Sequence, residues 1–186
     1  MISEWNAVPL RLLVGYISKG IAPSYAESKS DNTVTVLNQK CNRNFLINYE
    51  EARLHDTTKK KVPIERMLID SDILINSTGA GTAGRVAQID HVPTATTVDG
   101  HMIIIRSNGI VTQKYLGYAL KLHQHQILQL DEGSTGQTEL NRERLLDEIV
   151  VSYPCSRIIQ EGIVQLLENI DQKIKTNVEI NDNLAA

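Results

Sequence analysis

The C-terminal stretch from Arg157 to Leu184 constrains the fold most, because it has the pattern of one long amphipathic helix. Apolar and amide side chains recur there at alternating spacings of four and three residues, the heptad pattern of a helix that packs against another helix. The alternating series consists of Ile163, Leu167, Ile170, Ile174, Asn177, Asn181 and Leu184, and Ile159 and Leu166 widen this seam at its start. The helix would be about 40 Å long at about 1.5 Å per residue. It needs a packing partner, because packing supplies most helix stability.

Two packings are open for this helix. It can pair with a second helix, in which case Asn177 and Asn181 would fix register and orientation at some cost in stability. It can instead fold back on its own domain. The heptad pattern favours the helix pair.

The stretch Asp70–Val86 is the second constraint, since strand formers lead there into a loop rich in glycine and hydroxyl groups that ends at Arg85. Gly79, Gly81 and Gly84 spell the dinucleotide-binding fingerprint G-x-G-x-x-G. That fingerprint needs a long helix directly after the third glycine and an acidic residue about 20 residues on, and a proline and a β-branched run follow here instead. The loop is suited to contact a polyanion or base edges, and its plain alternative is a tight turn.

Length and composition indicate one soluble domain with an appendage. No apolar run approaches the ~20 residues that span a bilayer, and the N-terminus does not resemble a signal peptide, so we expect a cytoplasmic protein. The formal net charge of -3 gives no global argument for nucleic-acid binding, which must depend on a local patch or a larger complex. Cys41 and Cys155 lie far apart, which argues against a disulfide framework or a zinc site.

Hydrophobic patterning predicts an α+β domain with a mixed sheet over residues 1–154, followed by the helix of residues 155–186. Residues 15–25 are expected to form a loop that connects two strands. The expected elements are a strand or short helix at 10–14, a strand at 32–38, a hairpin of strands at 95–99 and 101–106, a helix at 112–130 and a final strand at 149–151.

Polar and cationic side chains concentrate in several expected loops. Arginine and asparagine can make bidentate contacts with base edges, and lysine can contact phosphates, although such residues are also common in solvated loops. The candidate DNA-binding residues are Lys19, Gly20, Ser24, Tyr25, Lys40, Arg43, Asn44, Lys60, Ser77, Thr78, Gly79, Gly81, Thr82, Arg85, Ser134, Thr135, Gly136 and Gln137.

Recognisable catalytic motifs are missing from the sequence. There is no H-E-x-x-H, no S-x-x-K, no G-x-S-x-G around Ser134, and no cysteine with a persuasive histidine partner. His123 and His125 are two residues apart on an expected helix and so point in different directions, unlike a helical metal pair. We therefore expect no enzyme activity, no cofactor and no metal.

Four segments resemble, in order, the DNA specificity subunit of type I restriction-modification systems. They are Trp5 with GYISKGI at 15–21, VLNQKC at 36–41, DILINSTG at 72–79 with GRV at 84–86, and GSTGQ at 133–137 with Leu140 and Leu145. A heptad helix follows them, so the resemblance covers nearly the whole chain. The start of the helix departs from the family, which often has a richer proline and Glu-Gln signature than Tyr153–Ser156 and Gln160-Glu161 provide.

The resemblance implies two target-recognition domains joined by two long helices that pack antiparallel as a coiled coil. Each domain would read one half of a split DNA target, while separate modification subunits carry the adenine methyltransferase site and a restriction subunit cuts. This chain has one such domain and one helix, so it is a natural half-subunit, a truncated form or the first half of a longer polypeptide. A C2 homodimer through the C-terminal helices would rebuild the two-domain arrangement.

The principal hypothesis is therefore a DNA-sequence reader without chemistry of its own, whose loops gather on one face. Double-stranded DNA and the modification and restriction subunits are its expected partners. An alternative is a coiled-coil assembly module that docks proteins of such a system instead of reading DNA. A nucleotide-binding enzyme would require the loop at 79–84 to open a helix. The target bases, and which loop residues read bases and which hold phosphates, cannot be derived from the sequence.

Overall fold

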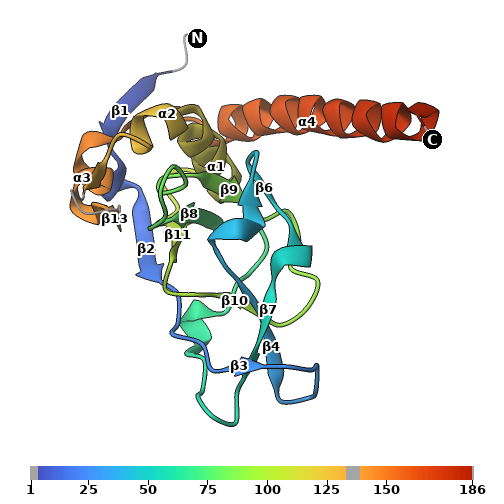
Figure 1. Ribbon diagram of the computed structural model, residues 1–186. Coiled ribbons are helices and arrows are strands. Elements are labelled where there is room, and N and C mark those ends of the chain that lie inside the picture. The colour runs from blue at the N-terminus through green and yellow to red at the C-terminus, as the bar shows by residue number, and fades with distance from the viewer. Residues whose placement is uncertain (1–3, 133–138, 186) are drawn as a thin grey trace.

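The computed structural model describes residues 4–132 and 139–185, and shows an α+β domain beneath one long helix (Figure 1). This arrangement of mixed sheets and a C-terminal helix confirms the predicted fold class. The central sheet is antiparallel and consists of β2 (Val14–Lys19), β11 (Met102–Ser107), β8 (Ile73–Asn76) and β9 (Val86–Gln88). The second sheet is mixed and consists of β10 (Thr96–Val98), β4 (Thr33–Leu37), β7 (Arg53–Asp56) and β3 (Tyr25–Ala26).

Three smaller strand pairs and several helices complete the fold. The pairs are β1 (Trp5–Pro9) with β14 (Val150–Pro154), β5 (Asn42–Arg43) with β6 (Leu46–Ile47), and β12 (Asp131–Glu132) with β13 (Glu139–Leu140). The α-helices are α1 (Gln113–Leu122), α2 (Gln124–Ile127), α3 (Arg142–Glu148) and α4 (Arg157–Ala185). Short 3-10 turns lie at Leu10–Leu12, Gln39–Cys41, Tyr49–Glu51 and Ile64–Arg66.

The central sheet is buried on both faces. Side chains alternate between the two faces of a strand. On β8, Ile73 and Ile75 therefore join the larger core with α1, while Leu74 packs in a second core beside the second sheet. Because both faces are covered, β8 and β11 are continuous apolar runs in the sequence.

The expected hairpin at 95–106 is wrong. β10 pairs in parallel with β4 in the second sheet, whereas β11 lies between β2 and β8 in the central sheet. The turn at Asp99 and Gly100 therefore carries the chain from one sheet to the other. Two adjacent apolar strands and a turn residue cannot by themselves distinguish this crossing from a hairpin.

The strand or short helix expected at 10–14 is present as a short 3-10 helix at Leu10–Leu12, between β1 and β2. Two further expectations need correction. Residues 15–19 form part of β2 instead of a loop, because β11 offers them an antiparallel partner. The expected helix at 112–130 is broken at His123, and the side chain of Gln124 accepts a hydrogen bond from the Val86 N–H (2.8 Å) just after the break. The strand expected at 32–38 is present as β4, and the final strand as β14.

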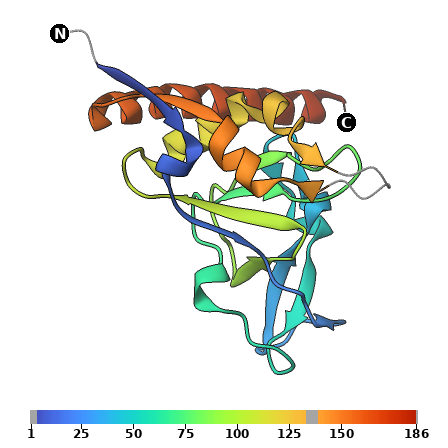
Figure 2. The same cartoon turned by 90° about the vertical axis from the view of Figure 1, so that its left-hand side faces the viewer.

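Helix α4 folds back on its own domain, but only along its first part. Its first part lies against α1, where Lys114 forms an ion pair with Glu168 and the Tyr118 hydroxyl donates to Asp171 (2.9 Å). The part beyond Asp171 is exposed and extends past the domain (Figure 1). In Figure 1 and in Figure 2 the second sheet lies at the opposite end of the domain from α4. Within residues 4–132 and 139–185, no helix is long and apolar enough to cross a membrane.

Candidate nucleic-acid interface

One end of the central sheet brings together residues from five separate parts of the chain. The antiparallel register places Lys19, the last residue of β2, opposite Ile103, and places Asn76, the last residue of β8, opposite Met102. We call this end the loop edge and define it by Lys19, Gln39, Thr78, His101 and Glu139. The side chain of Lys19 forms an ion pair with Glu139. The Thr78 hydroxyl lies 2.7 Å from Nδ1 of His101 and donates to Oε1 of Gln39 (3.3 Å).

The glycine loop at the loop edge turns sharply without starting a helix. Gly79, Gly81 and Gly84 all have positive φ, between 68° and 115°, the region that favours glycine. The Gly84 N–H donates to the Asn76 carbonyl (2.8 Å), so the loop closes on the strand that it leaves and continues directly into β9. The helix that a dinucleotide site requires is therefore not formed after this loop.

The tip of the same loop is open. A side chain added at Gly81 would meet no atom within 4 Å, whereas one added at Gly84 would touch the backbone of Ile127 and Leu128 at 3.0 Å. Gly81 and its neighbour Thr82 therefore form the part of the loop that can approach a ligand. Arg85 is half-buried at the end of the loop, with its guanidinium 3.4 Å from the Gly81 carbonyl.

The hairpin of β5 and β6 presents two of the predicted residues. Asn44 and Phe45 form its two-residue turn with φ of 53° and 65°, the signs that a type I′ turn requires. Arg43 and Asn44 are exposed on this hairpin. A hairpin of this type is compact, so it holds both side chains in a defined direction.

Buried amides join the hairpin to the glycine loop. The amide nitrogen of Asn42 donates to Oδ1 of Asn76 (3.2 Å) and to the Arg85 carbonyl (2.8 Å), and that of Asn76 donates to the Gln39 carbonyl (3.1 Å). Asn42 and Asn76 are fully buried. These hydrogen bonds attach the hairpin to the end of the glycine loop, so the two segments lie side by side on one surface.

Two predicted residues at the loop edge support the backbone and expose no side chain. A Cβ at Gly20 would come within 2.1 Å of the Val98 carbonyl oxygen, so this glycine allows two chain segments to touch. Ser77 is buried, its N–H donates to the His101 carbonyl, and its carbonyl accepts from the Leu140 N–H. Both residues position the loops.

Tyr25 lies in β3 of the second sheet, and Ser24 and Lys60 lie in the chain segments next to β3 and β7. Figure 1 shows β3 and β7 at the end of the domain far from α4. The buried ring of His55 links two of them, since its Nδ1 accepts from the Ser24 N–H (2.8 Å) and its Nε2 lies 2.7 Å from the Lys60 carbonyl. The guanidinium of Arg53 stacks on the Tyr25 ring at 3.3 Å.

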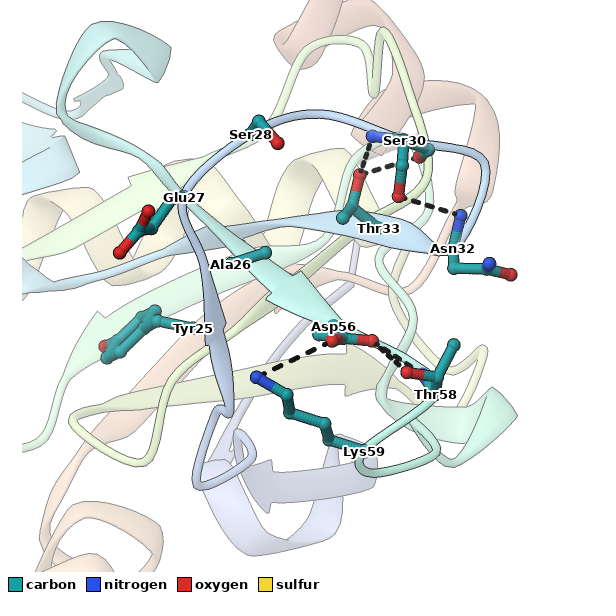
Figure 3. Close-up of a pocket in the computed structure, with 10 residues that line it drawn as sticks. All are labelled: Tyr25, Ala26, Glu27, Ser28, Ser30, Asn32, Thr33, Asp56, Thr58 and Lys59. Atoms are coloured by element: carbon teal, nitrogen blue, oxygen red, sulfur yellow. Dashed lines mark hydrogen bonds and ion pairs between the residues drawn. The ribbon is translucent and has the colours of Figure 1, made fainter.

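A shallow polar hollow of about 450 Å³ lies beside this group (Figure 3). It is lined by Tyr25, Ala26, Glu27, Ser28, Ser30, Asn32, Thr33, Asp56, Thr58 and Lys59. Hydrogen bonds from Thr58 lower the pKa of Asp56, which keeps this carboxylate charged. The hollow is therefore a poor place for a phosphate.

Three residues of the loop edge were missed by sequence reasoning: Gln39, His101 and Glu139. They are far apart in sequence and meet only through strand pairing, so no spacing signal could have found them. The predicted residues 134–137 lie outside the described residues. Lys40 is exposed in the turn at Gln39–Cys41.

Few groups in the described part of the chain are suited to catalysis. Residues 4–132 and 139–185 contain no group of three or more His, Cys, Asp or Glu side chains that could hold a metal ion. Burial raises the pKa of the Cys41 thiol, which makes it a poor nucleophile.

Helix α4 carries two stripes of side chains on different faces. Gln160 and Val164 are buried against the domain, and Ile163 also packs on its core. Most of the predicted seam residues are exposed instead: Ile159, Leu166, Ile170, Ile174, Asn177, Asn181 and Leu184. Ile163 and Leu167 are half-buried, between the two stripes.

The model of the family described as the type I restriction modification DNA specificity domain matches residues 3–186. The chain belongs to this family, which confirms the resemblance inferred from the sequence motifs. No match is found among curated protein sequences.

Three solved structures show the same fold. The S subunit of a type I restriction-modification system from M. genitalium has a TM-score of 0.64 at 13% identity, and the match covers 94% of this chain and 41% of that one. The HsdS subunit from Thermoanaerobacter tengcongensis has a TM-score of 0.61 at 16% identity, with 95% and 39% covered. A third structure, described as bearing on complex assembly of the type I R-M system, has a TM-score of 0.63 at 16% identity, with 92% and 39% covered. The chain thus spans about two-fifths of the length of these structures.

Proposed function

We propose that this chain is a non-catalytic, sequence-specific DNA recognition subunit, or part of one, that reads one half of a split target. Partner subunits would then methylate adenine in that target or cleave the DNA. Membership of the specificity-domain family supports this role. The observation that carries it is the surface formed by the loop edge, the β5–β6 hairpin and the open glycine loop, which hydrogen bonds of Asn42 hold together. This surface contains Lys19, Arg43 and Arg85, although the chain as a whole is acidic.

The side chains at this surface divide by chemistry. Arg43 and Asn44 are exposed on a stiff hairpin, and they are the types that make bidentate contacts with guanine and adenine edges. Each good contact of this kind contributes about 1–3 kcal/mol of discrimination. Lys40 and Lys19 would hold phosphates, and Gly81 and Thr82 would let the backbone approach the DNA closely. Gln39 and His101 join this proposed reading surface.

The group in the second sheet has a smaller part in this proposal. Ser24 and Lys60 have polar groups that already bond within the domain, and the guanidinium of Arg53 stacks on one face of the Tyr25 ring. Contact of these residues with DNA would be to the backbone alone. Since phosphate contacts carry no direct sequence information, changing them would weaken binding to all sequences alike.

We further propose that two copies pair through the exposed seam of α4, with the helices antiparallel. The exposed apolar stripe on a projecting helix supports this, because such a stripe gains stability only by burial. A C2 pair would present two reading domains at a fixed separation. The division into a recognition domain at 1–154 and a pairing helix at 155–186 belongs to the same proposal. So do binding to modification and restriction subunits and a cytoplasmic location.

The test is a genome-wide map of methylated adenines in cells that carry the matching modification subunit, with and without this chain. A split motif that appears only with the chain is expected, and a palindromic motif would indicate two copies. Arg43→Ala should lose or relax one position of the motif. Arg157→Ala is the control, because this exposed arginine pairs with Glu161 at the start of α4. An identical map with and without the expressed, assembled chain would refute the proposal.

A further inference from the structure

The side chain of Gln160 joins α4 to the domain at three points. It lies in the first turn of α4 and is 1% exposed. Its Oε1 accepts a hydrogen bond from the Thr112 N–H (2.9 Å), and its Nε2 donates to the Pro154 carbonyl (3.0 Å) and, more weakly, to the Ile110 carbonyl (3.5 Å). One buried amide therefore connects the N-cap of α1, the end of β14 and the base of α4.

Polar contacts further along α4 extend this attachment. Glu168 forms an ion pair with Lys114, and Asp171 accepts from the Tyr118 hydroxyl (2.9 Å) and lies 3.5 Å from Nζ of Lys121. The contact positions of α4, from Gln160 through Val164 and Glu168 to Asp171, are spaced by four, four and three residues and so lie on one face of the helix. Hydrogen bonds hold both ends of this face, at Gln160 and at Asp171, so they fix the direction of α4 as well as its position.

The direction of α4 matters because the helix is a long lever. Its 29 residues span about 43 Å at about 1.5 Å per residue. A tilt of about 5° at the base would move the far end by about 4 Å, slightly more than the rise of about 3.4 Å per base pair along DNA. If α4 is to select one separation between the two half-sites, its angle to the domain must therefore stay within a few degrees.

We infer that Gln160 is a positioning residue that sets the spacing between the two halves of the DNA target. It touches no DNA and acts through the angle of α4. This inference rests on the proposed function, in which α4 connects two reading domains. Loss of the Gln160 side chain leaves the Thr112 N–H and the Pro154 carbonyl without this partner, and the helix base then loses the contact that orients it.

The experiment maps methylated sites for Gln160→Ala beside Gln165→Ala. The second variant is the matched control, because Gln165 is exposed on the same helix and bonds only along it, to Asn169 (3.2 Å). The original chain and the control should methylate motifs with one spacer length. For Gln160→Ala, the fraction of methylated sites with a spacer one base pair longer or shorter should rise about tenfold, equivalent to about 1.4 kcal/mol of lost discrimination. The half-site sequences should not change.

A single, unchanged spacer in a Gln160→Ala protein that methylates normally would overturn the inference. If this variant does not fold, Asp171→Ala removes the exposed contacts to Tyr118 and Lys121 and should broaden the spacer in the same direction. A single spacer with Asp171→Ala would then count against the inference.

A second measurement needs no methylation. Spin labels at Ser28→Cys and Asn183→Cys, in a Cys155→Ser background diluted with unlabelled chain, report the distance between the domain and the end of α4. Gln160→Ala should broaden that distance distribution, and an unchanged distribution would overturn the inference. If the original chain directs no methylation, the proposed function fails while this measurement still decides whether Gln160 orients the helix.

Discussion

Replacing Ile170 with aspartate tests whether the exposed seam of α4 is a pairing surface. Ile170 lies near the middle of the seam and is 46% exposed, and the seam residues Leu166 and Ile174 beside it are 62% and 56% exposed. An antiparallel pair centred near residue 172 would place Ile170 against Ile174 of the second copy, and Ile159 against Leu184. Ile170 of each copy is therefore buried in the dimer, so a single substitution changes two buried positions.

The expected effect follows from the remaining exposure of this side chain. Complete burial of an isoleucine stabilises by about 1.5–3 kcal/mol, so burying the exposed half contributes about 1 kcal/mol per copy. A buried, unpaired carboxylate adds a penalty of several kcal/mol. A total of at least about 4 kcal/mol for two copies would raise the dimer Kd about 1,000-fold.

The assay is size-exclusion chromatography with light scattering over a concentration series, with circular dichroism to show that the helix is retained. Ile180→Asp is the matched control, because Ile180 is 49% exposed on the same helix but lies about 80° around it from Ile170. The control should change the Kd less than tenfold. A dimer unaffected by Ile170→Asp, or an original chain that stays monomeric at every concentration, would refute the reasoning.

Three further predictions concern the domain. Arg106→Met should lower the free energy of unfolding by about 3–5 kcal/mol in urea titrations. The reason is that the buried carboxylate of Asp72 loses its ion pair with Arg106, in which Nε lies 2.7 Å from Oδ1. A loss below about 1 kcal/mol would contradict this. Glu139→Gln removes the ion pair of Lys19 and frees this lysine to contact a phosphate, so the variant should bind DNA more tightly and with a steeper salt dependence. Unchanged binding across a salt series would argue against phosphate contact by Lys19. Burial raises the pKa of Asp99, so the folded state binds this proton more readily than the unfolded state and loses stability as pH rises through that range. The Asp99→Asn variant has no such carboxylate, so its stability relative to the original chain should increase as the pH rises from 4 to 7. A stability difference between the two proteins that does not change with pH would contradict the raised pKa of Asp99.

Local patterns predicted those parts of the fold in which one element determines its own structure. The heptad spacing indicated a long C-terminal helix, and α4 is such a helix. The alternation at 32–38 predicted β4, since period-2 burial is a property of one strand. The motifs at 15–21 and 72–79 pointed to the family, and the match over residues 3–186 confirms it.

Strand partners were beyond the reach of local patterns. β10 and β11 are adjacent in sequence and similarly apolar, yet they belong to different sheets because β10 pairs with β4, whereas β11 pairs with β2 and β8. The break at His123 has the same kind of cause, since Gln124 bonds to β9, a strand far away in sequence. The prediction of a loop at residues 15–19 was wrong because these residues form a strand by pairing with β11, which lies far away in the sequence.

The sequence by itself determined the classes of contact that this protein can make: cations and amides in loops, an amphipathic helix, and no recognisable catalytic motif. Only the tertiary structure decided which of these residues act together. Lys19, Gln39, Thr78, His101 and Glu139 meet because antiparallel pairing brings the ends of β2, β8 and β11 to one side. Gln160 holds α4 to the domain for the same reason. The packing of whole helices and strands determines which distant residues become hydrogen-bond partners, and a local sequence pattern contains no information on that packing.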